Sequence, residues 1–192
     1  MKKILVIAAL VMFSFANAQK GSILVMGSVG YNSQKDSNFI SDTNQHFFTF
    51  SPKVGYQFHE NWTGGIEGRV STLKQELSNH TESKNTSFGV GGFIRYSKPL
   101  NETFFAYADF GVGYQNTKTT NNTGVPNTEG DGVYAVITPA IFINVSKGFG
   151  LNFNIGGLGY STLKYDGVNG NSIKSFNFNL GQAFSVGISK NF

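Results

Sequence analysis

Large apolar residues recur at every second position over several stretches of this chain. The clearest stretch is 46–58, where Phe48, Phe50, Val54, Tyr56 and Phe58 alternate with small or polar residues. A period of two indicates a β-strand, because successive side chains of a strand point to opposite faces. The pattern predicts an all-β chain with eight strands, at residues 21–32, 46–58, 62–71, 87–97, 104–114, 132–145, 150–160 and 175–192.

The predicted connections alternate between long and short. The long ones are rich in Asn, Ser, Thr, Lys and Asp and cover 33–45, 72–86, 115–131 and 161–174, whereas the short ones cover 59–61, 98–103 and 146–149. An antiparallel up-and-down transmembrane β-barrel with both termini in the periplasm has this order, with long loops outside and short turns inside. A soluble barrel or sandwich is the alternative, but it has no reason to collect every long connection at one end.

The apolar face of the predicted wall is expected to contact lipid. Aromatic residues near strand ends on this face could form the two interfacial girdles of a membrane barrel; they are Tyr31, Phe48, Phe58, Trp62, Phe88, Tyr96, Phe104 and Tyr114. Pro52 and Pro139 fall inside predicted strands, and because proline cannot donate to a ladder we expect a bulge or local defect at each.

The first residues predict export. Lys2 and Lys3 precede an apolar run from Ile4 to Phe15, and Ala16-Asn17-Ala18 provides the small-x-small pattern for cleavage. We therefore predict a cleavable signal peptide at 1–18 and one barrel domain at 19–192. An uncleaved anchor is the alternative, although the run is short for a membrane span.

The composition limits which kinds of partner the chain is expected to bind. The chain carries a net charge of +4, and removing Lys2 and Lys3 leaves 4 − 2 = +2. This nearly neutral balance, without a basic run, speaks against a nucleic-acid partner. The chain has no cysteine, so no disulfide can stabilise it.

Five charged residues fall on the small or polar face of neighbouring strands: Lys53, Glu67, Arg69, Arg95 and Asp109. The interior of an eight-stranded barrel is just wide enough for side chains to fill. We expect these charges to pair inside the lumen as a structural network, because buried charges require partners. An ion or proton pathway through them is the alternative.

The export pattern, the eight strands and three segments resemble the small outer-membrane barrels of the OmpA/OmpX type. The segments are FTFSPKVGYQF (48–58), FIRYSKP (93–99) and AFSVGISKNF (183–192). The resemblance implies the outer membrane of a Gram-negative bacterium, contact with its lipid and lipopolysaccharide, and a terminal aromatic, Phe192, that the barrel-assembly machinery reads. Two features depart from it: no peptidoglycan-binding domain is expected after the barrel, and Lys190 occupies an apolar-face position.

The sequence contains no evident catalytic, cofactor or metal set. His46, His59 and His80 have no nucleophile and orienting carboxylate at a readable spacing. We therefore expect a non-enzymatic protein without cofactors, with a structural or adhesion-like role in which long polar loops contact an extracellular ligand. A narrow channel for ions or small solutes is the main alternative, and a lipid-modifying enzyme using His46 is a third.

Overall fold

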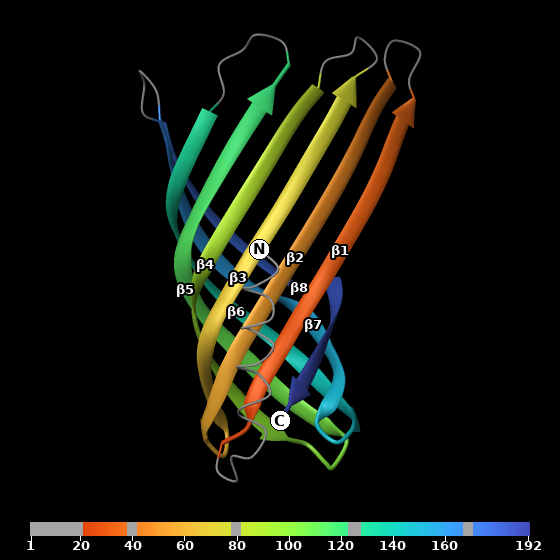
Figure 1. Ribbon diagram of the computed structural model, residues 1–192, viewed down its shortest axis with the longest axis vertical. Helices are drawn as coiled ribbons and strands as arrows, with labels where there is room; N and C mark the ends of the chain where they lie inside the picture. The colour runs from red at the N-terminus through yellow and green to blue at the C-terminus, as the bar shows by residue number, and fades with distance from the viewer. Residues whose placement is uncertain (1–20, 38–41, 78–81, 123–127, 167–170) are drawn as a thin grey trace, which may run out of the picture.

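Eight antiparallel strands form one closed sheet in which neighbours along the chain are also neighbours in space (Figure 1). In this computed structural model the strands are β1 (Ile23–Ser37), β2 (Asp42–His59), β3 (Trp62–Leu77), β4 (Glu82–Pro99), β5 (Phe104–Asn121), β6 (Thr128–Ser146), β7 (Phe149–Tyr165) and β8 (Ser172–Asn191). The structure describes residues 21–37, 42–77, 82–122, 128–166 and 171–192, and for 36–37, 42, 77 and 182–185 the backbone alone. The predicted all-β barrel is confirmed.

The two faces of the wall differ as the alternation predicts. Along β4, exposed Ile94 is followed by buried Arg95, and along β2, Val54 is 42% exposed whereas Gly55 is buried. Large apolar side chains therefore cover the outside and polar ones line the lumen, which is the order of a membrane barrel. A soluble barrel or sandwich would bury those apolar side chains.

The buried apolar side chains that the structure describes inside the barrel form two small clusters. One consists of Leu24, Met26 and Phe93, and the other of Tyr107, Ala140 and Phe142. The rest of the described interior is largely polar, so hydrogen bonds and ion pairs must hold much of it together. Within the described chain no helix is long and apolar enough to cross a membrane.

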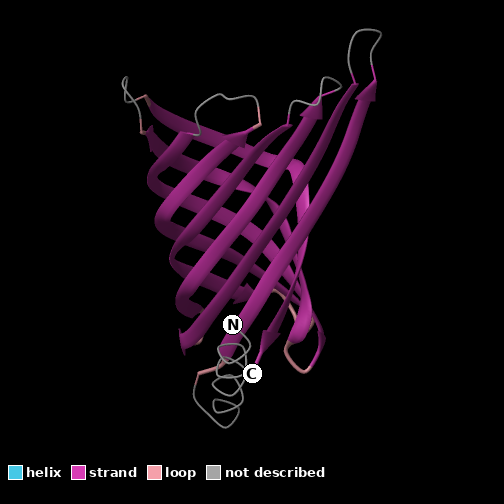
Figure 2. Cartoon of the chain, turned by 45° about the horizontal axis from the view of Figure 1, so that its top comes forward, coloured by secondary structure: helices cyan, strands magenta, loops and turns pink. Residues whose placement is uncertain are grey.

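The strands extend much further than predicted at one end of the barrel. Residues 60–61, 100–103 and 147–148 connect strands at the end where both ends of the described chain lie; we call this the turn end and the opposite one the loop end. At the loop end the predicted long loops are wrong, because strands occupy most of 33–45, 72–86, 115–131 and 161–174. Alternation of apolar residues stops there, yet ladder hydrogen bonds do not need an apolar face, so pairing continues between polar residues. Figure 2 shows the strands continuing toward this end.

The two prolines behave differently. The ladder of β6 with β7 shifts register between Ile137 and Ala140, which brackets Pro139 and confirms the predicted bulge. Pro52 keeps the register of β1 and β2 unbroken, opposite Gly27. On the other side of β2, the ladder with β3 keeps its register but lacks pairs at Ser51 and Pro52, so Pro52 causes the expected local defect and not a bulge.

The ladder that closes the barrel is short. The strand ladder of β1 with β8 runs only from Leu24 with Asn191 to Gly27 with Ile188, which is four residue pairs among the described residues, and backbone bonds between Ile23 and Phe192 extend it by one position. By contrast, β4 pairs with β5 from Ser83 to Pro99. Figure 1 shows red-orange β1 and blue β8 meeting near the turn end and separating toward the loop end. We call the four pairs the seam.

Candidate functional site

A cluster of two cations and two anions crosses the lumen, closer to the turn end than to the loop end. Arg95 donates from Nε and Nη2 to the two carboxylate oxygens of Asp109, at 2.6 and 2.9 Å. Lys53 bridges Asp109 at 2.9 Å and Glu67 at 2.8 Å. Asp109 is 2% exposed and Arg95 5%. The pairing neutralises the four charges, as burial in a confined interior requires.

Further side chains extend this cluster toward the turn end. The Arg95 guanidinium lies 3.7 Å from the centre of the Tyr107 ring and donates to the sulfur of Met26 at 3.2 Å. The Tyr107 hydroxyl donates to Asn152 at 2.9 Å, and Asn152 donates to Ser189 at 2.9 Å. The guanidinium plane is held in one orientation, because it stacks on an aromatic ring and donates two hydrogen bonds to one carboxylate.

Tyr134 covers the cluster on the loop side. Its hydroxyl donates to Glu67 at 2.9 Å, and its ring lies over two glycines, Gly91 and Gly113. A Cβ atom would lie 2.6 Å from the Tyr134 hydroxyl at Gly91 and 2.7 Å from the ring at Gly113. Only glycine at these two positions lets the ring reach across the lumen to Glu67.

Together these side chains form what we call the plug, and every strand contributes to it. The members are Met26 (β1), Lys53 (β2), Glu67 (β3), Arg95 (β4), Tyr107 and Asp109 (β5), Tyr134 (β6), Asn152 (β7) and Ser189 (β8). A network that crosses the lumen and touches all strands both occludes the interior and fixes the strands relative to one another.

The plug separates two cavities. On the turn side a vestibule of about 380 Å³ is lined by Gln57, Glu60 and Asn144 and reaches Arg95. On the loop side a much smaller cavity, of about 50 Å³, lies beside Arg69, Gln115 and Tyr134. The two share none of their lining residues.

The structure brings together four of the five interior charges expected from sequence. Arg69 lies apart from them: no ion pair among the described residues includes it, and its side chain is exposed in the loop-side cavity. An expectation built on charge alone misses Tyr107, Tyr134 and Asn152. All three occupy inward positions of their strands, and this parity is the signal that could have found them.

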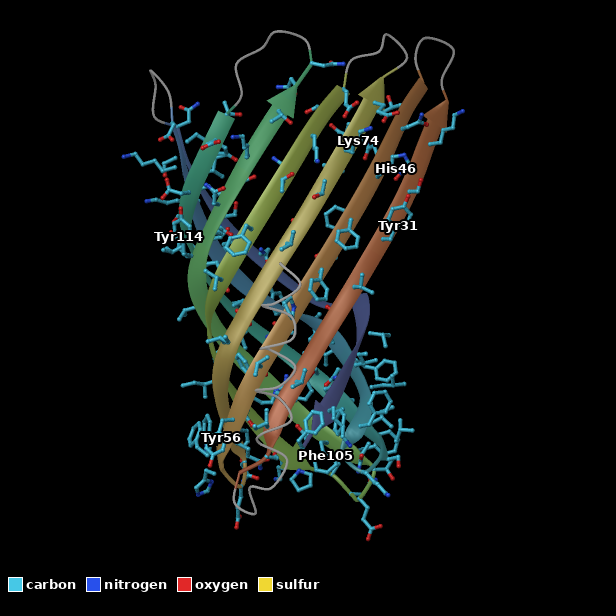
Figure 3. All side chains as sticks on the ribbon, viewed as in Figure 1. Tyr31, His46, Tyr56, Lys74, Phe105 and Tyr114 are labelled. Atoms are coloured by element: carbon cyan, nitrogen blue, oxygen red, sulfur yellow. The ribbon has the colours of Figure 1, made fainter. Side chains whose placement is uncertain are left out.

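His46 does not stand in a catalytic arrangement. Its Nδ1 lies 3.1 Å from the Tyr31 hydroxyl, and the two rings stack at 6.4 Å. Figure 3 shows His46 between Tyr31 and Lys74, toward the loop end. Glu76 is bonded instead to Lys74, at 2.5 Å, and this bond raises the pKa of Lys74 and lowers the pKa of Glu76. In the described part of the chain no group of three His, Asp or Glu residues could hold a metal ion.

Phe192 takes part in closing the sheet through its backbone. Its N–H donates to Ile23 at 3.0 Å, and its carbonyl accepts from the Ile23 N–H at 3.2 Å. The ring is 53% exposed, so it is accessible on the barrel surface. The predicted signal peptide falls within residues 1–20, outside the described residues.

Comparison with known proteins gave a family match. The family model described as outer membrane protein beta-barrel domain matches residues 5–185. No curated protein sequence matches. Solved structures with a similar fold include Ail of Yersinia pestis (TM-score 0.43, 12% identity, covering 91% of this chain and 100% of Ail). Neisserial surface protein A (NspA) has a TM-score of 0.43 and 14% identity, over 91% of this chain and 100% of NspA. The translocator domain of the autotransporter NalP from Neisseria meningitidis has a TM-score of 0.41 and 16% identity, over 96% of this chain and 73% of that domain.

Proposed function

Because the chain belongs to the outer membrane protein beta-barrel domain family and is therefore a protein of the Gram-negative outer membrane, we propose that it is a non-enzymatic barrel with a closed lumen. Its loop end faces outside the cell and contacts partners there, in a structural or adhesion-like role. The outer wall contacts lipid and lipopolysaccharide, and the barrel-assembly machinery reads Phe192.

The plug is the observation that carries the proposal. An ion crossing the barrel would have to separate Arg95 from Asp109 and Lys53 from Glu67, in a space where water cannot replace the lost partners. A narrow lumen filled by paired charges thus supports a closed barrel and leaves the loop end as the surface for interaction.

The geometry at His46 supports the absence of catalysis. A hydrolytic site requires a nucleophile, a base and a group that orients the base. His46 is hydrogen-bonded to Tyr31 and not to a carboxylate that could orient it, and the carboxylate of Glu76 forms an ion pair with Lys74.

Conductance in a planar lipid bilayer tests the proposal. Refolded protein should give no stable openings at neutral pH, whereas the double variant Glu67→Ala, Asp109→Ala should be leaky or fail to insert. Steady, ion-selective openings of the unmodified protein would establish the channel alternative in place of the closed barrel.

A further inference from the structure

Among the inward side chains that the structure describes, there is one cation more than the plug balances. Lys53 and Arg95 are matched by Glu67 and Asp109, which leaves Arg69 as the surplus charge. Arg69 is the next inward residue after Glu67 on β3, on the loop side of the plug. A permanently charged guanidinium inside a barrel, with no carboxylate partner among the described residues, is an anchor available to an anion.

The wall beside Arg69 leaves room for a bound group. Its cross-strand partner on β4 is Gly89, which in turn faces Gln115 on β5. Gly89 has no side chain, and a Cβ there would lie 3.6 Å from the Tyr134 ring and 3.8 Å from the Cβ of Arg69. The cavity of about 50 Å³ is lined by Arg69, Gln115 and Tyr134 together with Phe88 and Leu163, and is large enough for a carboxylate group.

Hydroxyl and amide groups line the route from this cavity to the loop end. Ser87 and Thr117 border the cavity and lie 3.0 Å apart. Both hydroxyls donate to Asn85, which itself donates to Thr119 at 2.9 Å. A polar wall of this kind suits a solute that carries hydroxyl groups of its own.

We propose that Arg69 binds the carboxylate of a small hydroxylated acid, such as a sugar acid, that enters from the loop end. One carboxylate neutralises the single surplus charge and matches the two-pronged donor geometry of a guanidinium. A phosphate dianion would leave an uncompensated negative charge close to Glu67. The site specifies which class of ligand the loop end binds, and it therefore rests on the proposed function, in which the loop end faces outside the cell.

Titration of ¹⁵N-labelled refolded protein with sodium glucuronate tests this inference, with neutral glucose as the matched control. Glucuronate should shift the amide signals of Gly89, Gln115 and Thr117 in a saturable way, and glucose should not. Arg69→Gln should weaken binding at least about tenfold, because a charge-assisted hydrogen-bonded pair is lost. Arg69→Lys should retain part of the affinity.

Lys118→Gln is the matched control variant, because Lys118 is an exposed cation near the loop end that is already paired with Glu129. It should bind glucuronate as the unmodified protein does. The inference is overturned if glucose shifts the same signals equally, if Arg69→Gln binds normally, or if inorganic phosphate binds more tightly than glucuronate. Conductance of the same preparation separates the two proposals: openings contradict the closed barrel, whereas a silent barrel without glucuronate binding contradicts only the role of Arg69.

Discussion

At the scale of single residues, burial decides how much the loss of an ion-pair partner destabilises the folded barrel. The Arg95–Asp109 pair is almost fully buried, whereas both members of the Lys74–Glu76 pair are more than a third exposed. Removing one partner of a buried pair leaves a charge that water cannot solvate, while an exposed partner is solvated at once. The same type of contact therefore has very different consequences in the plug and at the loop end.

Asp109→Ala should destabilise the barrel by about 3–5 kcal/mol, because Arg95 and Lys53 lose their shared carboxylate. Urea unfolding in lipid vesicles measures the change. Glu76→Ala is the control and should change stability far less. Equal losses in the two variants would show that the plug is not the stabilising element.

The two faces of β2 should also differ in their tolerance of charge. Val54→Arg places a cation on the lipid side and should cost about 2–4 kcal/mol if this residue lies near the bilayer midplane. Gln57 lines the water-accessible vestibule, so Gln57→Arg should cost much less. Unfolding free energies in vesicles provide the comparison, and equal costs would contradict the assigned faces.

At the scale of elements, the strands are long but not equally secured. The seam between β1 and β8 has four residue pairs in the described part of the chain, and beyond it Val29, Tyr31 and Phe176 are among the most exposed apolar residues, at 68%, 69% and 67%. Backbone groups without ladder partners are costly at membrane depth. The plug compensates in part, because Met26 and Ser189, which pair across the seam, both belong to it.

Hydrogen exchange should reveal this difference. Amides of β1 and β8 that point toward each other beyond Gly27 should exchange well before the amides that join β4 to β5, since protection follows local pairing and contact density. Mass spectrometry of peptides from the refolded protein reports the rates. Uniform protection around the barrel would mean that the seam closes fully in the membrane.

At the scale of the whole molecule, stability and assembly are separable. Phe192 bonds to Ile23 through backbone atoms, while its ring is exposed. Phe192→Ala keeps both backbone bonds and removes the aromatic group that we propose the assembly machinery reads. The yield in the outer membrane should fall while the stability of the refolded protein changes little.

A paired measurement checks that expectation. Outer-membrane fractions quantify the yield in cells, and unfolding in vesicles quantifies the stability. Phe149→Ala, which removes another exposed ring on the outer wall at the turn end, is the control. An unchanged yield for Phe192→Ala, or an equal fall for both variants, would count against the assembly signal.

The sequence by itself determined the local features of this protein. The period of two assigned strands and faces, and the alternation alone places Val54 outside and Lys53 inside, because side-chain direction in a strand depends only on position along it. It underestimated strand length at the loop end, where both faces are polar and the alternation that marks a strand is lost.

The tertiary structure decided which inward residues meet. Lys53 and Asp109 are 56 positions apart, and only the register of four successive strands brings them to 2.9 Å. The same register places Tyr134 over two glycines, leaves Arg69 outside the plug, and limits the seam to four described pairs. These contacts depend on strand stagger and barrel closure, which are properties of the assembled sheet that no local pattern encodes.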